Sequence, residues 1–416
     1  MDFLNDPIGF IAQWLRSLME GLGLAPDFVT FVLVALGAAL MGTIALLFMH
    51  FTIWLERRVI GRMQDRMGPN RVGPEGLLQT LADMIKLATK EDITPIGADK
   101  VVYNFAPILV VISAVTAWAV LPFAINIYGA DISVAVLYVV AVGSLGTLAI
   151  MLAGWASNNK YALLGAFRTV AQLVCYEVPM ILSLLVPVIL AGSMSMKDIV
   201  VAQQSVWFLF SAPIAALIFF ISSVAETGRA PFDLLEAESE IVAGFNIEYS
   251  GMKFGMFMVA EFLHSFTVGA LTAALFLGGW QVPLVSNSAI APWALPWVGA
   301  IAFVAKSFFG YGLIILARAT LPRIRIDHML DMNWKFLVPL SVASIVITLV
   351  VTKVGQVLAL GEWGTAITLF VVNVAVLWAA LSWANTQAGQ VRRRVEAPLT
   401  ATVDLHAHDE VPAAAH

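Results

Sequence analysis

Cysteine is almost absent from this sequence of 416 residues. Cys175 is the single cysteine, which excludes an intrachain disulfide and any zinc site or iron–sulfur cluster held by several cysteines of this chain. The six histidines show no metal-ligand spacing, apart from a His-x-His pair at His406 and His408 in a polar, Ala-rich stretch near the end. We therefore predict no metal site in this chain.

Charged residues are also scarce. They make up 12% of the chain, whereas hydrophobic residues make up 60% and the mean hydropathy is +0.87. Soluble domains carry roughly twice this fraction of charge. The net charge of −5 excludes a nucleic-acid partner, which requires a basic face, and no glycine-rich phosphate-binding motif is present. These features indicate a polytopic membrane protein.

Long apolar runs predict an all-α fold with about nine transmembrane helices, since about 20 apolar residues span a bilayer. An amphipathic helix is expected at residues 6–20 on the membrane surface, and another around residues 77–88 in a loop. The nine spans are expected near residues 28–55, 101–126, 132–154, 169–192, 205–225, 254–280, 293–317, 335–352 and 364–384.

Basic residues gather in every second connection, which orients the chain. Residues 56–100 hold five arginines and three lysines, and further basic residues follow at Arg229, Lys253, Arg318, Arg323 and Arg392–Arg394. The positive-inside rule places the N-terminus outside and puts the loops 56–100 and 226–253 and the C-terminal tail in the cytoplasm.

An acidic stretch between two apolar segments, residues 226–249, is the main candidate for chemistry. If it is helical from Asp233, then Asp233, Glu236 and Glu240 share one face. Carboxylates about 6 Å apart repel by roughly 2.5–3 kcal/mol at an effective dielectric of about 20, so they share protons as a coupled set. The alternative is a solvated acidic loop. Its charged residues are Glu226, Arg229, Asp233, Glu236, Glu238, Glu240 and Glu248.

Three ionisable residues lie well inside apolar spans, namely Glu177, Glu261 and Lys306. Such residues cost at least ~2.5 kcal/mol to insert unpaired and are functional by default. A purely structural Glu261–Lys306 pair is the alternative. Pro179 frees a backbone carbonyl near Glu177, and we expect water or Tyr176 to bond there. His50 and His264 are expected to be satisfied core histidines.

The stretch from Glu56 to Pro74 combines five arginines with Glu56, Asp65 and two Gly-Pro turns. A lipid headgroup anchor explains the basic residues. Rigid turns and interspersed acids fit better with a structured surface that docks an acidic partner or lines a polar pocket.

Four segments carry a family resemblance over about residues 27–352: ERRVIGRMQDRMGPNRVGPEGLLQTLADMIKL, GWASNNKYALLGAFRTVAQLVCYEVP, AETGRAPFDLLEAESEIVAGFNIEYSG and RATLPRIRIDHMLDMNWKFLVPL. The chain resembles the NuoH-type membrane subunit of proton-pumping NADH:quinone oxidoreductase, respiratory complex I. The resemblance implies a core of eight helices that forms much of a quinone tunnel. Quinone is then the substrate, and no metal, flavin or iron–sulfur cluster belongs to this chain.

The resemblance also assigns residues position by position. It implies quinone-tunnel roles for Glu56, Arg57, Arg66, Asp83, Arg229, Phe232, Arg318 and Arg323. Proton-coupling roles are implied for Glu177, Glu226, Asp233, Glu236, Glu238, Glu240, Glu248, Glu261 and Lys306. The implied partners are the peripheral quinone-site and iron–sulfur subunits, small membrane subunits, antiporter-like subunits and lipid. The implied location is a bacterial plasma membrane.

Two departures from the family pattern stand out. Leu235 replaces a Pro or Thr common in relatives, which is a mild change, and one more span with a tail follows the eight-helix core. We therefore expect four parts: an interfacial helix at 1–26, the core at 27–352, an extra transmembrane helix at 353–390 and a disordered tail at 391–416. A shield for the tunnel or a contact with a neighbouring subunit would explain the extra helix.

Three other functions compete with the quinone enzyme. A secondary transporter predicts paired internal repeats, which the sequence lacks. A purely structural anchor explains the basic loop but leaves Glu177, Glu261 and Lys306 unexplained. The membrane subunit of a related hydrogenase would do without a quinone tunnel, and the complete arginine-rich and acidic segments favour the quinone enzyme over it.

Overall fold

The computed structural model describes residues 6–235, 242–282 and 291–396, and the regular secondary structure of these residues is almost entirely helical. Within the described residues, strands form only a short antiparallel hairpin, β1 (Pro122–Ala124) with β2 (Ile127–Tyr128). Short turns of helix are found at Pro74–Gly76, Ala117–Val120 and Gly244–Asn246. The expected all-α fold is therefore confirmed.

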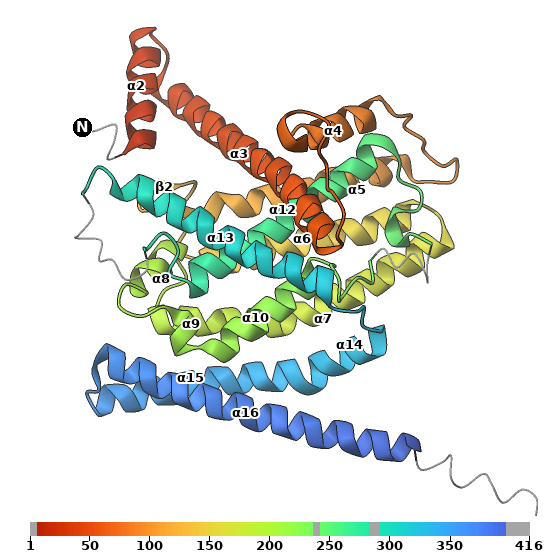
Figure 1. Cartoon of the computed structure of the whole chain (residues 1–416). Coiled ribbons are helices and arrows are strands. Elements are labelled where there is room, and N and C mark those ends of the chain that lie inside the picture. Colours follow the sequence, from red (N-terminus) through yellow and green to blue (C-terminus); the bar gives the residue numbers. More distant parts are fainter. Residues whose placement is uncertain (1–5, 236–241, 283–290, 397–416) are drawn as a thin grey trace, which may run out of the picture.

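Eight of the described helices are long and apolar enough to cross a membrane. They run roughly side by side, with α3 oblique to the rest and α16 on the outer side of α15 (Figure 1). Their bounds are α3 Pro26–Met63, α5 Lys100–Thr116, α6 Ala135–Ala156, α7 Lys160–Ala191, α12 Gly251–Phe276, α13 Leu295–Thr320, α14 Ile326–Met332 continued by a π-helix Asn333–Leu337 and α15 Val338–Val357, and α16 Gly361–Glu396.

The fifth expected span, near residues 205–225, is divided into α9 (Phe208–Ser211) and α10 (Pro213–Glu226). Pro213 has no backbone N–H, and the chain leaves helical geometry at Ala212. The break frees the Ser211 carbonyl, which accepts a hydrogen bond of 3.3 Å from Asn373 Nδ2 of α16. A backbone oxygen at membrane depth is thus satisfied by the outermost helix.

Two amphipathic helices lie at opposite ends of the bundle (Figure 1). The N-terminal helix α2 (Pro7–Gly21) lies across the direction of the long helices and exposes Ile8, Ile11, Trp14 and Leu18. Asp6 caps it, because its Oδ1 accepts a 2.9 Å bond from the Gly9 N–H. The second, α4 (Gln79–Thr89), lies beside the C-terminal part of α3. Both predicted surface helices are present, and their place at a membrane interface stays a prediction.

Three prolines lie inside the described helices, and the carbonyls freed by two of them are bound by side chains from other segments. Pro179 cannot donate to the Cys175 carbonyl, and Asn333 Nδ2 of the π-helix donates to it at 2.8 Å instead. Tyr176, which was expected there, donates to the Met329 carbonyl at 3.1 Å. In α5, Pro107 frees the Tyr103 carbonyl, which accepts a 3.2 Å bond from the Tyr249 hydroxyl.

Glycines bring α12 and α13 into backbone contact. A Cβ on Gly269 would lie 2.6 Å from the Ser307 carbonyl oxygen, and one on Gly310 would lie 3.1 Å from the Gly269 Cα. Small residues at such crossings let membrane helices pack closely. The contact places Tyr311, next to Gly310, against α12.

We predict that Asn333→Ala lowers the free energy of unfolding by about 1–3 kcal/mol, because it strands the buried Cys175 carbonyl. Pro179→Ala restores a backbone N–H donor to that carbonyl. In the Pro179→Ala background, Asn333→Ala should therefore lower the free energy of unfolding by clearly less. The measurement is denaturant unfolding of the detergent-solubilised protein.

Asn104→Ala serves as the control for this cycle. Asn104 is exposed and donates to the Lys100 carbonyl of its own helix, so its replacement should change the free energy of unfolding by no more than about 0.5 kcal/mol. If Asn333→Ala lowers the free energy of unfolding equally in the wild-type and Pro179→Ala backgrounds, Asn333 does not stabilise the protein through the Cys175 carbonyl.

Candidate functional site

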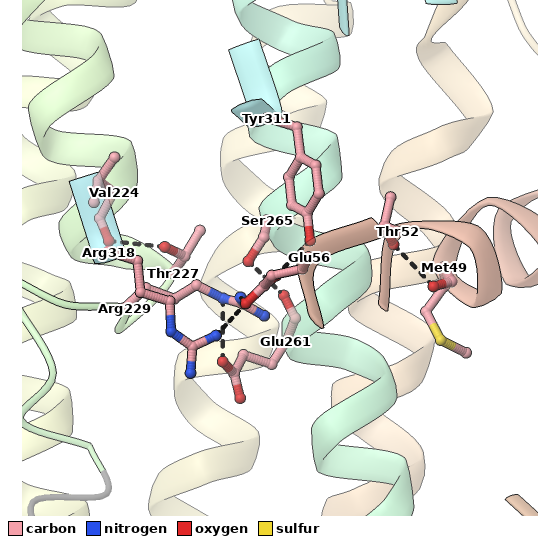
Figure 2. A network of polar contacts seen from close by, with 10 residues as sticks. All are labelled: Met49, Thr52, Glu56, Val224, Thr227, Arg229, Glu261, Ser265, Tyr311 and Arg318. Carbon is pink, nitrogen blue, oxygen red and sulfur yellow. Dashed lines mark hydrogen bonds and ion pairs between the residues drawn. The ribbon is translucent and has the colours of Figure 1, made fainter. Parts of the chain in front are cut away.

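Glu56, in the last turns of α3, is the centre of a buried charge cluster (Figure 2). Its side chain is 2% exposed. Oε1 accepts hydrogen bonds from Nη1 of both Arg229 and Arg318, and Oε2 accepts one of 2.5 Å from the Tyr311 hydroxyl. One carboxylate therefore joins α3, α13 and the turn after α10.

Arg229 connects this carboxylate to a second one. Its guanidinium is buried, its Nε lies 3.3 Å from Glu261 Oε1, and its CZ lies 4.4 Å from the centre of the Phe262 ring. Burial by itself disfavours the cation, but Glu261 and Glu56 raise the pKa of Arg229 above its usual value. Two carboxylates and two arginines, counting Arg318, thus balance one another in formal charge.

The turn that presents Arg229 depends on glycine. Gly228 has φ +66°, and a Cβ there would lie 2.4 Å from Leu235 Cδ1. Only glycine adopts this conformation without strain beside a packed leucine. The sequence Gly228-Arg229 therefore reverses the chain tightly after α10 and directs the arginine to Glu56.

A cavity of about 140 Å³ lies beside the cluster. Most of its wall is apolar and comes from α5, α6, α7, α10 and α12, for example Val110, Leu184, Phe219 and Leu271. Among the described residues, its ionisable lining side chains are Glu226, Arg229, Asp233, Glu261, His264 and Arg318. Five of these six were predicted site residues, so the structure brings them together around one space.

Arg57 and Asp83 form a separate pair near the surface. Arg57 Nη1 lies 2.6 Å from Asp83 Oδ2, and Lys86 Nζ lies 3.3 Å from Asp83 Oδ1. Partial burial favours the neutral acid, but the bonds from Arg57 and Lys86 prevail and hold the Asp83 pKa below its usual value. Arg66 is exposed and bonds Gln64 Oε1 at 2.7 Å. This group ties α4 to the end of α3 without lining the cavity.

Four other predicted residues, Glu177, Glu248, Phe232 and Arg323, do not line the cavity. Glu177 Oε1 accepts a 3.5 Å bond from Thr147 Oγ1, and Glu248 Oε1 accepts one of 2.7 Å from Asn159 Nδ2. Phe232 is buried with its ring 5.4 Å from that of Tyr176. Arg323 is half-buried in the loop after α13.

Within the described part of the chain, Lys306 is surrounded by backbone carbonyls and not by a carboxylate. Its ammonium donates to the carbonyls of Leu277, Gly279 and Gln281 at 2.6, 3.0 and 2.6 Å, and lies 4.5 Å from the Trp207 ring centre. These bonds use all three N–H donors of a lysine. The possible Glu261–Lys306 pair is therefore not formed, and Glu261 lies beside Arg229 instead.

The acidic stretch is only partly described. Residues 227–235 form a turn and extended chain, so the helix that was expected to begin at Asp233 does not begin there. Glu236, Glu238 and Glu240 lie outside the described residues. The face that Asp233 was expected to share with Glu236 and Glu240 required a helix from Asp233, so that expectation is not met at Asp233.

Two residues of the site are not among those predicted from the sequence. Tyr311 lies seven residues before Arg318 and so on the same face of α13, a spacing that would have revealed it. His264 is expected from the sequence to be a core histidine, yet its Nε2 lies 3.7 Å from Glu226 Oε1. Its spacing of three residues from Glu261 was the available signal.

We predict that Glu56→Gln lowers the free energy of unfolding by about 3–5 kcal/mol, because it leaves the buried Arg229 charge with one carboxylate instead of two. The control is Glu75→Gln. Glu75 also pairs with an arginine, Arg58, but its side chain is 70% exposed, so the loss should stay under about 1 kcal/mol. Denaturant unfolding of the solubilised protein measures the free energy of unfolding of both variants. Equal losses in Glu56→Gln and Glu75→Gln would contradict the prediction that the buried ion pairs contribute more than the exposed one.

Comparison with known proteins gives one consistent result. The sequence model of a family described as NADH dehydrogenase matches residues 36–349. The H subunit of the NADH-quinone oxidoreductase of Dehalococcoides mccartyi (strain CBDB1) is 47% identical over 326 residues, 78% of this chain and 87% of the relative. The corresponding protein of Geobacillus kaustophilus is 47% identical over 341 residues, 82% and 98% of the two chains. The chain therefore belongs to the NADH dehydrogenase family, alongside these H subunits of NADH-quinone oxidoreductases.

Proposed function

We propose that this chain is the subunit of a membrane-bound NADH:quinone oxidoreductase that forms the quinone tunnel and couples quinone reduction to proton translocation. The observation that carries the proposal is the Glu56 cluster, which brings a buried carboxylate, the half-buried carboxylate of Glu261 and two arginines together beside an apolar cavity. Quinone is the substrate, and the oxidoreductase reaction belongs to the assembled complex.

The cavity suits an apolar molecule with a polar head group. Ligand sites combine apolar walls with a few polar groups that fix orientation. Here the walls come from five apolar helices, and Arg229 and Arg318 supply donors beside the carboxylates of Glu226 and Glu261. A polar head group near these residues would exchange hydrogen bonds with the same cluster that holds Glu56.

The buried carboxylates provide the coupling step of the proposal. Charges in a low-dielectric interior interact strongly, so a change of charge at one group alters proton binding at its neighbours. Arg229 connects Glu56 to Glu261, and Glu226 and Asp233 line the same cavity. A charge change near Arg229 would pass to Glu261 and Glu226, and from there to Glu177. Lys306 is the weakest member of this set, because its ammonium already has three carbonyl partners.

The orientation and the partners complete the proposal. The loop 64–98, α4 and the turn after α10 lie at one end of the bundle, away from α2 and the hairpin (Figure 1). That end carries the exposed Arg62, Arg66 and Arg71. It would face the cytoplasm and dock the peripheral quinone-site and iron–sulfur subunits, and the N-terminus would lie outside a bacterial plasma membrane. Small membrane subunits, antiporter-like subunits and lipid would cover the sides.

We predict that Glu261→Gln in assembled membranes reduces NADH:quinone turnover and membrane potential together. The change keeps the shape of the side chain but removes a charge-assisted contact with Arg229 worth about 1.5–3 kcal/mol. If that free energy is lost in the rate-limiting step, the turnover falls by about ten- to a hundredfold. Turnover and potential are measured on the same vesicles, after the amount of assembled complex has been quantified.

Glu20→Gln is the matched control, because Glu20 is exposed on α2 at the opposite end of the bundle. It should leave both signals unchanged. Wild-type turnover and potential in Glu261→Gln would refute the role of the buried carboxylates.

A further inference from the structure

His264 lies beside Glu226 on the wall of the cavity, and this contact is separate from the cluster around Glu56. The two side chains come from different helices, α12 and α10, and their nearest atoms are His264 Nε2 and Glu226 Oε1 at 3.7 Å. Both line the cavity of about 140 Å³. Within the described parts of the chain, His264 is the one basic side chain at ion-pair distance from Glu226.

The other groups around the pair differ from histidine in their chemistry. Among the residues that line the cavity, α5 and α6 contribute Ser113 and Thr147 but no ionisable side chain. The ionisable groups nearby are Glu177 on α7, Arg229 and Asp233 in the turn, Glu261 on α12 and Arg318 on α13. Arginines stay charged, whereas an imidazole binds and releases a proton near neutral pH.

We propose that His264 and Glu226 share one exchangeable proton and act together as a proton-transfer pair at the cavity. In the transfer, the proton leaves the Glu226 carboxyl group and binds His264 Nε2, which gives a carboxylate and an imidazolium. The net charge of the pair does not change, so the proton moves between α10 and α12 without creating an isolated charge in a low-dielectric interior. This inference rests on the proposed coupling function.

The geometry requires a small approach or one bridging water. Proton transfer needs heavy atoms within about 2.6–3.2 Å of each other, or one water between them. The separation of 3.7 Å is slightly longer, and the cavity of about 140 Å³ exceeds the roughly 30 Å³ that one water occupies in the liquid. Either route uses space that the structure provides.

The position of His264 connects this pair to the Glu56 cluster. His264 lies one turn after Glu261, so both side chains leave α12 on the same side. Glu226 is the last residue of α10, three residues before Arg229. A proton on His264 therefore places a positive charge near the Glu261–Arg229 contact, and a proton on Glu226 removes a negative one.

The test is the pH dependence of coupled turnover in His264→Asn, measured as NADH:quinone turnover and membrane potential in vesicles that hold the complete complex. An adjacent opposite charge lowers the pKa of a carboxyl group by about 1–3 units. Without the imidazolium, Glu226 should ionise at higher pH, and the acidic limb of the profile should move up by about one to three pH units. A purely structural histidine would change the amount of complex but leave the profile in place.

His50→Asn is the matched control. His50 is a half-buried histidine of α3 and has no carboxylate at ion-pair distance within the described residues. Its replacement by Asn should leave the pH profile unchanged. If His264→Asn does not assemble, His264→Gln, which also lacks a titratable ring, replaces it.

A double substitution separates the possible outcomes. In a Glu226→Gln background, His264→Asn should cause no further shift, because the partner that it acts on is gone. A His264→Asn profile that superimposes on the wild type, while Glu261→Gln still abolishes coupling, refutes the proton-transfer pair and leaves the proposed function intact. Intact coupling in Glu261→Gln instead refutes the proposed function.

Discussion

The charge of Glu56 is the constraint on which the arrangement of this molecule depends. A carboxylate that is 2% exposed in an apolar bundle requires positive partners, and Arg229 and Arg318 come to it from two separate segments. Arg229 needs more negative charge than one shared carboxylate, and Glu261 supplies it from α12. Satisfying one buried charge thus fixes α3, α10, α12 and α13 relative to one another, and the cavity lies beside this fixed group.

Backbone carbonyls inside the bundle also require polar partners, as the charge of Glu56 does. Carbonyls freed by a proline, a break or a helix end have no water to bond at membrane depth, so side chains must reach them. Asn333 binds the Cys175 carbonyl, Tyr249 binds that of Tyr103, and Lys306 binds three carbonyls beyond the end of α12. Some polar residues inside the bundle therefore complete the backbone, whereas others, such as Glu56, belong to the charge cluster or face the cavity.

The sequence predicts the helices far better than the contacts between them. Apolar runs locate the spans because they report burial in lipid, and charges within these runs identify Glu177, Glu261 and Lys306 as exceptional. The partners of a charge are decided by packing between distant segments: Glu56 and Arg318 are 262 residues apart. No local pattern distinguishes Lys306, which binds carbonyls, from Glu261, which pairs with arginine. The spacing of His264 from Glu261 indicates a shared helix face, but it does not reveal the partner Glu226, which lies on another helix.

The hydrogen bond between Asn373 and the Ser211 carbonyl has a consequence for the evolution of this sequence. The family match ends at residue 349, so α16 lies outside it, yet α16 supplies the donor at the break between α9 and α10. A shortened descendant without α16 would need a new donor for that oxygen, or a straight helix in place of Ala212-Pro213. We therefore expect α16 and the break at Ala212-Pro213 to change together. Each restricts the substitutions that the other tolerates, and the loss of either requires a compensating change.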